Sequence, residues 1–160
     1  MSEEIRINQS ATREEIYREL LPQAKALLSP EPDEIARMAN LTAILHEIPG
    51  FFWVGFYFVK GNELVLGPFQ GPVACSRFSI EKGVCGAAVR ENRTQIVPDV
   101  DAFPGHIACS SLSRSEIVLP IRDASGKVRA VLDIDSIRLD DFSEVDEQYL
   151  MHFLELVKLN

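Results

Sequence analysis

The run from residue 51 to 59 reads Phe-Phe-Trp-Val-Gly-Phe-Tyr-Phe-Val, a stretch dominated by aromatic and β-branched residues. Residues of this kind favour a buried strand. Residues 60–62 read Lys-Gly-Asn and predict a turn, and residues 63–66 start a partner strand. The stretch therefore predicts a β-hairpin.

Two amphipathic helices are expected before this hairpin. Thr12 and Glu15 have the spacing of a capping box, and apolar residues then recur on one face to about residue 28. After a proline-rich break, a second helix is expected over residues 33–47, and the Pro-Gly pair at 49–50 ends it. The first third of the chain is therefore predicted to be helical.

Shorter elements follow the first hairpin. The pattern predicts an extended piece over residues 73–80, a small-residue helix over 83–91 and a strand over 94–97. A long loop over 99–115, a second hairpin over 116–135 and a last helix over 143–158 are expected next. Two hairpins imply antiparallel pairing, which predicts an α+β fold with helices flanking an antiparallel sheet. The chain shows no internal repeat or linker, so residues 1–160 are expected to form a single domain.

Composition and charge exclude several function classes. Of the 160 residues, 46% are hydrophobic and 25% charged, an ordinary globular balance. The net charge of −8 disfavours binding to nucleic acid or to an anionic membrane surface. No apolar run approaches the roughly 20 residues of a membrane span, and the N-terminus lacks the apolar region of a secretory signal. A cytoplasmic location is therefore expected.

Three cysteines, Cys75, Cys85 and Cys109, suggest thiol chemistry. An odd number does not make a closed disulfide framework, and the cytosol keeps thiols reduced. Cys85 falls in the first turn of the 83–91 helix, where the helix dipole lowers a thiol pKa; its alternative role is that of a small packing residue. Cys109 lies in the long loop and is reachable. Cys75 alone would pass as a buried core thiol.

His106 and the other histidines give weaker signals. His106 is three residues from Cys109 and either tunes that thiol or is a solvated loop histidine, which is the more common case. The chain has no CxxC pair, and its histidines do not fall at ligand spacing, so no metal site is expected. It also lacks phosphate-binding glycine motifs and the GxSxG motif.

Three acidic residues form a candidate site. Asp133 and Asp135 alternate with apolar residues, so both carboxylates point to the same side of one strand. Neighbouring carboxylates repel, so either one holds a proton or both bind a cation. Glu116 opens the preceding strand and is placed to converge on them. The alternative, a polar solvent-facing sheet edge, is disfavoured by the strongly apolar neighbours.

Trp53 and Tyr57 are four residues apart on one predicted strand and therefore share a face. They are either plain core residues or an aromatic wall for a small apolar group. In the second interpretation, the indole N–H or the phenol O–H is a polar handle for the ligand.

These candidates lie within six motifs. The motifs are Gly-Phe-Phe-Trp-Val-Gly-Phe-Tyr at 50–57, Leu-Gly-Pro-Phe-Gln-Gly-Pro-Val-Ala-Cys at 66–75, Gly-Val-Cys-Gly at 83–86, Phe-Pro-Gly-His-Ile-Ala-Cys at 103–109, Ser-Glu-Ile-Val-Leu-Pro at 115–120 and Val-Leu-Asp-Ile-Asp-Ser at 131–136. Together they resemble the free methionine-(R)-sulfoxide reductases, a family built on a single GAF domain. The resemblance covers nearly the whole chain, and a generic GAF domain lacks the three-cysteine set.

The resemblance implies unequal roles for the cysteines. Cys109 would be the nucleophile, although the helix N-terminus alone favours Cys85. Its thiolate would attack the sulfoxide sulfur and become a sulfenic acid. Cys75, or Cys85 as a relay, would condense with it to a disulfide, and thioredoxin would reduce that disulfide. No bound cofactor is implied.

The resemblance also implies roles for the other candidates. Asp133, Asp135 or Glu116 would protonate the sulfoxide oxygen, and the remaining carboxylates would hold the α-ammonium of the free amino acid. Trp53 and Tyr57 would box the S-methyl group. The partners would be free methionine-(R)-sulfoxide and thioredoxin, in a role connected with oxidative stress, and a homodimer through the first helix is left open.

Two other function classes compete with this enzyme. A stand-alone GAF sensor for a small metabolite would carry its cysteines incidentally, although sensors are usually attached to an output domain and this chain has no room for one. A redox sensor would use the disulfide itself, without turnover, as its output.

Overall fold

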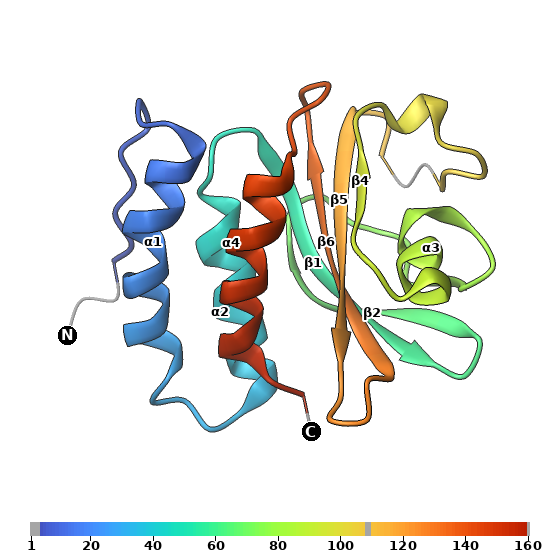
Figure 1. Cartoon of the computed structure of the whole chain (residues 1–160), viewed down its shortest axis with the longest axis horizontal. Helices are drawn as coiled ribbons and strands as arrows, with labels where there is room; N and C mark the ends of the chain where they lie inside the picture. The colour runs from blue at the N-terminus through green and yellow to red at the C-terminus, as the bar shows by residue number, and fades with distance from the viewer. Residues whose placement is uncertain (1–3, 108–109, 160) are drawn as a thin grey trace.

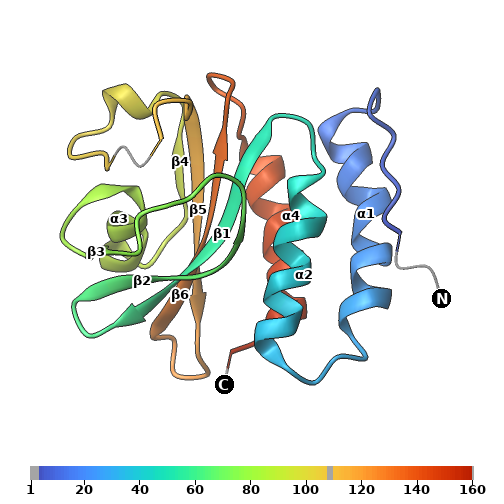
Figure 2. The same ribbon diagram turned by 180° about the vertical axis from the view of Figure 1, so that it is seen from behind.

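A computed structural model describes residues 4–107 and 110–159. One six-stranded antiparallel sheet in the order β3-β2-β1-β6-β5-β4 forms its centre. Helices α2 and α4 cover one face of the sheet, α1 packs on those two from outside, and α3 covers the other face (Figures 1 and 2). The elements are α1 Arg13–Leu28, α2 Glu34–His46, β1 Phe51–Lys60, β2 Glu63–Gln70, β3 Arg77–Ser79, α3 Gly83–Glu91, β4 Gln95–Val97, η1 Val100–Ala102, β5 Ser115–Arg122, β6 Val128–Ser136, α4 Glu144–Leu154 and η2 Glu155–Val157.

The predicted α+β architecture is confirmed, including both hairpins and the helices that precede the first of them. Two details differ. Thr12 caps α1 by accepting the Glu15 N–H, but its hydroxyl donates to the Glu15 carboxylate, which does not reach back to the backbone as in a full capping box. The loop predicted over 99–115 contains a short 3₁₀ helix at Val100–Ala102, capped by Asp99.

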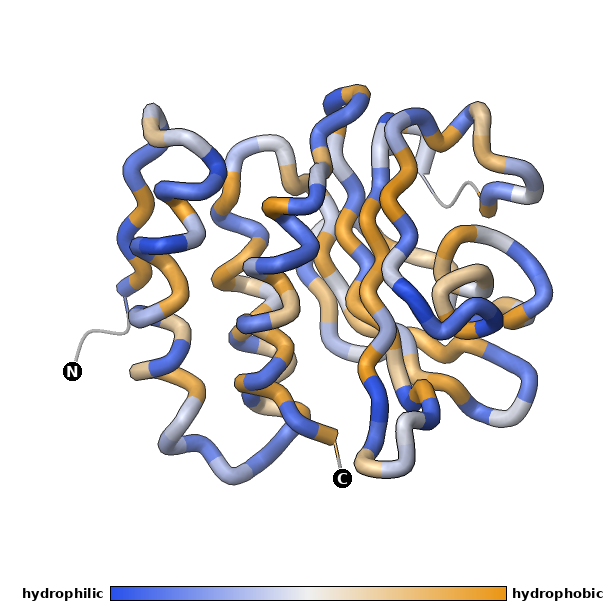
Figure 3. Tube along the Cα trace, in the orientation of Figure 1, coloured by the Kyte–Doolittle hydropathy of each residue, from blue (hydrophilic) through white to orange (hydrophobic). Residues whose placement is uncertain are grey.

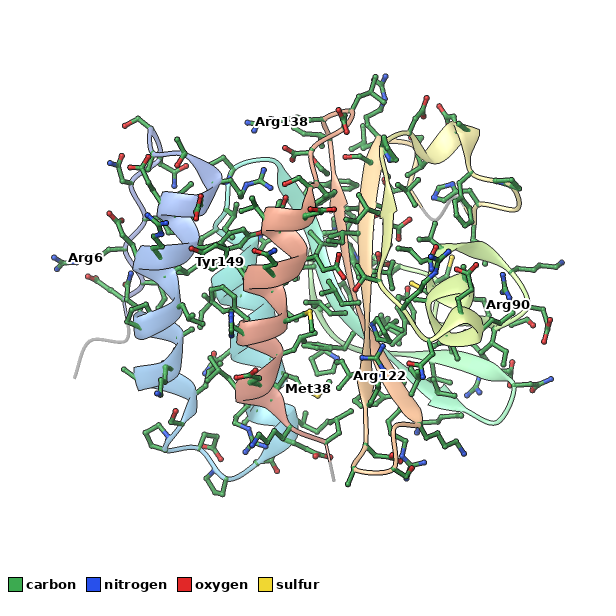
Figure 4. All side chains as sticks on the ribbon, viewed as in Figure 1. Arg6, Met38, Arg90, Arg122, Arg138 and Tyr149 are labelled. Atoms are coloured by element: carbon green, nitrogen blue, oxygen red, sulfur yellow. The ribbon has the colours of Figure 1, made fainter. Side chains whose placement is uncertain are left out.

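The central strands β1 and β6 serve two separate cores. Phe56 and Leu132 pack into the core beneath α2 and α4, whereas Tyr57 and Val131 pack into the core beneath α3. Figure 3 shows hydrophobic residues concentrated along these strands, and Figure 4 places Met38 between the helices and the sheet. The alternation along each strand thus places one set of side chains on the helices and the other on the α3 face.

Helix α1 is fixed to the rest of the chain by a partly buried polar network. Arg13 pairs with Asp146 at 2.8 Å and with Asp141 at 2.9 Å, and its guanidinium lies 4.6 Å from the centre of the Phe51 ring. The Tyr17 hydroxyl donates to the same Asp146 carboxylate at 2.6 Å. The buried apolar residues of α1 also pack into the core of their own chain, and a homodimer through this helix stays a prediction.

Arg13→Ala is expected to lower the free energy of unfolding by about 3 kcal/mol, because it leaves the buried Asp146 carboxylate without its cation. Arg18→Ala is the matched control: it removes an arginine from the same helix whose pair with Glu14 is exposed, so the expected loss is below about 0.5 kcal/mol. Urea unfolding measures both. Equal losses in the two variants would contradict a structural role for the Arg13 network.

Within residues 4–107 and 110–159, no helix combines the length and the apolar character needed to cross a bilayer.

Candidate active site

A cavity of about 60 Å³ lies between the sheet and α3, several times what one water molecule requires. Residues of β1, β3, α3, β5 and β6 line it, together with parts of the connections before β3 and β5. The cavity gathers six of the eight residues proposed from the sequence: Trp53, Tyr57, Cys85, Glu116, Asp133 and Asp135. Cys75 is adjacent to the lining residue Ala74. Cys109 lies outside the described residues.

The carboxylates converge as the strand pattern predicted. Asp133 and Asp135 point from the same face of β6, and the antiparallel register pairs Glu116 of β5 with Asp135. Glu116 and Asp133 are only 5% and 6% exposed, and one oxygen of each has no hydrogen-bond partner within the described part of the chain. Ser113 donates to Asp135 at 3.0 Å. The cluster is therefore a buried acidic group with acceptor atoms left for a ligand.

Burial favours the protonated, uncharged form of these carboxyls. It raises the pKa of Glu116 to about 8, with the charge of Asp135 as the second cause. Burial, followed by the charge of Glu116, holds the pKa of Asp133 well above its usual range. Burial and the charge of Asp133 do the same for the pKa of Asp135. A protonated carboxyl donates a hydrogen bond or a proton, so the cluster can act as a general acid at neutral pH.

Cys85 does not have the activated thiol that the helix N-terminus suggested. It is 4% exposed, and burial, followed by the charges of Asp133 and Glu116, raises its pKa well above the ordinary value. The helix-dipole argument was wrong here because it considers only the local backbone, whereas desolvation and two facing carboxylates act across space. Cys85 is a free thiol, and Cys75 is disulfide-bonded.

His106 also differs from its sequence interpretation as a solvated loop residue. Its side chain is 14% exposed and lines the cavity, with Nε2 3.7 Å from Glu116 Oε1. A loop folded back over the sheet buries this ring, which no local pattern reveals. His106 is therefore a pocket residue that can contact the carboxyl cluster.

Trp53 and Tyr57 form the predicted aromatic wall, with stacked rings whose centres are 5.8 Å apart. Phe69 stacks on Trp53 at 5.4 Å, and a Cβ at Gly55 would come within 2.4 Å of the Trp53 ring, so this stack requires glycine. Phe78 extends the wall by an edge contact with Tyr57 at 4.9 Å. One wall of the cavity is thus a continuous aromatic surface.

Sequence reasoning missed two pocket residues, Phe52 and Phe78. Strict alternation would place Phe52 on the opposite face from Trp53, but the β1–β6 register shifts between Phe51 and Trp53 and turns Phe52 toward the cavity. Phe78 lies in the expected extended piece, where pairing with Leu64 of β2 fixes its orientation. The sequence signal that could have identified both residues was the presence of an aromatic side chain in each of these two segments.

Donor atoms for a cation are also present. Cys85, Glu116 and Asp133 each offer one ligand atom, and these atoms lie within 4.8 Å of one another. Structural zinc sites use four protein ligands, whereas this group, within the described chain, has three. The three side chains could hold a small metal ion, and the expectation of no metal stays untested.

Comparisons with known proteins agree with this geometry. The family model described as "GAF domain" matches residues 31–159. A free methionine-R-sulfoxide reductase of Escherichia coli is 44% identical over 137 residues, covering 85% of this chain and 82% of that protein. GAF domain-containing protein A of Dictyostelium discoideum is 54% identical over 158 residues, covering 98% and 99%.

Among solved structures, the free methionine-R-sulfoxide reductase of Neisseria meningitidis in complex with its substrate superposes with a TM-score of 0.92 at 45% identity. The match covers 98% of this chain and 94% of that one. The chain therefore belongs to the GAF domain family, and its relatives over most of its length include free methionine-R-sulfoxide reductases.

Proposed function

We propose that this protein reduces free L-methionine-(R)-sulfoxide to L-methionine. The observation that carries the proposal is the buried carboxyl cluster of Glu116, Asp133 and Asp135 facing the aromatic wall of Trp53 and Tyr57 across one small cavity. A sulfoxide amino acid carries a polar oxygen, a cationic ammonium and an apolar S-methyl group, and this cavity offers a counterpart for each. Relatives that match most of this chain bear that activity in their names.

In the proposed first step, the Cys109 thiol takes the oxygen of the sulfoxide. Its sulfur attacks the substrate sulfur and forms a transient S–S bond, and the oxygen then moves to the Cys109 sulfur. As the S–O bond to methionine and the S–S bond break, Cys109 becomes a sulfenic acid and methionine leaves. The substrate sulfur is reduced by two electrons, and the Cys109 sulfur is oxidised by two. The assignment to Cys109 rests on the sequence motif, and the raised pKa of the buried Cys85 thiol supports it by disfavouring the competing nucleophile.

The sulfoxide oxygen gains negative charge during the attack, so a neighbouring acid speeds the step. Glu116 is our candidate because its pKa of about 8 keeps it protonated at neutral pH yet allows it to lose the proton. Asp133 and Asp135 would hold the α-ammonium, whose positive charge favours the ionised form of these two carboxyls when substrate is bound. A peptide-bound methionine has no ammonium at this position, which would make the enzyme selective for the free amino acid.

Recycling completes the proposed cycle. The Cys75 thiol condenses with the sulfenic acid, which forms a disulfide and releases water, and a dithiol protein such as thioredoxin reduces that disulfide. The disulfide-bonded Cys75 and the free Cys85 support Cys75 as the resolving cysteine. Both thioredoxin and a cytoplasmic location belong to the proposal.

The test is a coupled assay of NADPH oxidation with thioredoxin and thioredoxin reductase. We expect turnover with free methionine-(R)-sulfoxide, and little with the S epimer or with peptide-bound methionine sulfoxide. Absence of turnover with the R epimer, together with tight binding of methionine sulfoxide in calorimetry, would favour the sensor alternative.

A further inference from the structure

The segment that carries Cys75 crosses the pocket face between two strands. Residues 71–76, here called the strap, link β2 to β3, and Figure 2 shows this connection running across the sheet on the α3 side. Most of the strap side chains are exposed, Val73 to 90%, so they bury little surface. Apart from the disulfide of Cys75, the position of the strap therefore depends mainly on contacts to its backbone.

The aromatic wall supplies those backbone contacts. The Trp53 indole N–H donates to the Pro72 carbonyl at 3.1 Å, and the Tyr57 hydroxyl donates to the Cys75 carbonyl at 3.0 Å. Both donor side chains are at most 5% exposed, so each would lose a buried hydrogen bond if the strap moved away. The polar atoms assigned from the sequence to a ligand are thus bonded to the protein's own strap.

The first residue of the strap, Gly71, lies close against Phe52 and Trp53. Gly71 has φ +133°, and a Cβ there would lie 2.7 Å from the Phe52 carbonyl oxygen and 2.8 Å from Trp53 Cδ1. Only glycine can therefore bring the chain this close to the wall. At the far end, the Leu66 N–H donates to the Ser76 carbonyl at 3.0 Å. The backbone of Cys75 is held between these anchors.

We propose that Trp53 and Tyr57 are positioning residues for the resolving cysteine: their rings wall the substrate pocket while their polar atoms hold the strap where the Cys75 thiol meets the sulfenic acid. This inference rests on the proposed function. In the step concerned, an S–S bond forms between Cys75 and Cys109, the S–O bond of the sulfenic acid breaks, and the hydroxyl leaves as water with the thiol proton. The Cys75 sulfur is oxidised and the Cys109 sulfur is reduced.

The test is Tyr57→Phe, which keeps the ring and removes the hydrogen bond to Cys75. Rapid quench without reductant gives the rate of methionine formation, and dimedone trapping with mass spectrometry gives the lifetime of the sulfenic acid. We expect the sulfenic acid to live about ten times longer, beyond any slowing of methionine formation. A factor of about ten is the effect of one hydrogen bond lost in a transition state. Cys75→Ser sets the upper limit of that lifetime.

Tyr149→Phe is the matched control, since it removes a phenol hydroxyl that donates to Glu14, far from the strap, between α1 and α4 (Figure 4). It should leave both rates unchanged. An unchanged sulfenic acid lifetime in Tyr57→Phe, or equal slowing of both steps, would overturn the positioning role. If Tyr57→Phe fails to fold, Trp53→Phe, which loses the bond to Pro72, is read in the same way.

Hydrogen exchange separates this inference from the proposed function. The amides of residues 73–76 should exchange faster in Tyr57→Phe than in the parent protein, whether or not the protein reduces methionine sulfoxide. A parent protein without reductase activity would refute the proposed function. The exchange rates would still show whether the Tyr57 hydrogen bond holds the strap. Unchanged exchange in residues 73–76 would overturn the inference even in an active enzyme.

Discussion

Cys109→Ser is expected to lower methionine sulfoxide reduction by at least about 10³-fold, to the detection limit of the coupled assay. A serine hydroxyl is a far weaker nucleophile toward sulfur than a thiolate, and it cannot carry the oxygen as a sulfenic acid. The measurement is NADPH oxidation together with the yield of methionine in a single turnover without reductant. Both should fall together, because the loss is in the first chemical step.

Cys85→Ser is the comparison that decides between the two candidate nucleophiles. It replaces a buried thiol by a hydroxyl of similar size in the same cavity, so methionine should still form in a single turnover. If the complete loss appeared in Cys85→Ser and not in Cys109→Ser, the assignment of the nucleophile would be wrong. A loss confined to recycling in Cys85→Ser would instead identify Cys85 as a relay to the disulfide.

Glu116→Gln is expected to lower the rate of the sulfoxide step by about 10²- to 10⁴-fold, the range for a lost general acid. Because the pKa of Glu116 is raised to about 8, the parent enzyme should lose activity as the pH rises above that value. The variant cannot deprotonate at this position, so its low rate should lack this alkaline decline. Single-turnover rates between pH 6 and 9 measure both effects. An alkaline decline that persisted in the variant would mean that a residue other than Glu116 is the general acid.

The same substitution should stabilise the fold. Glu116 has a pKa of about 8 in the folded protein against an ordinary value of 4.5, so the folded state binds more protons between these values. The free energy of unfolding therefore falls as the pH rises from about 4.5 to 8. At pH 8 Glu116→Gln should recover most of this loss, about 4 kcal/mol, measured by urea unfolding.

Glu63→Gln provides the control for both measurements, because it removes an exposed carboxylate from the same sheet and should change stability little. A Glu116→Gln variant that is less stable than the parent at pH 8 would mean that the ionised carboxylate has a favourable partner in the folded protein. Greater stability with lost activity would instead identify Glu116 as a residue retained at a cost to the fold.

The strands could be predicted from the sequence because their patterns are local. The alternation in β6 placed Asp133 and Asp135 on one face, and the hairpin brought Glu116 beside them, as the structure shows. The spacing of Trp53 and Tyr57 placed both rings on one face in the same way. In each case period two and antiparallel pairing suffice, and no distant contact is needed.

The remaining features depend on contacts between distant segments. The raised pKa of Cys85 comes first from its burial and then from carboxylates that follow it by more than thirty residues, and the burial of His106 depends on where its loop folds. The bulge that turns Phe52 toward the cavity appears only once β1 is paired with β6. None of these features leaves a periodic pattern, so reading segments separately could not find them.

The alternation in β6 has a consequence for how active molecules arise. Leu132 and Ile134 pack in the core beneath α2 and α4, while Asp133 and Asp135 face the cavity. A slip of one residue would drive both carboxyls into that apolar core, where no water could solvate them. Mispaired molecules should therefore unfold or be degraded rather than persist as inactive protein, so the fraction of folded chains should equal the fraction with an assembled site.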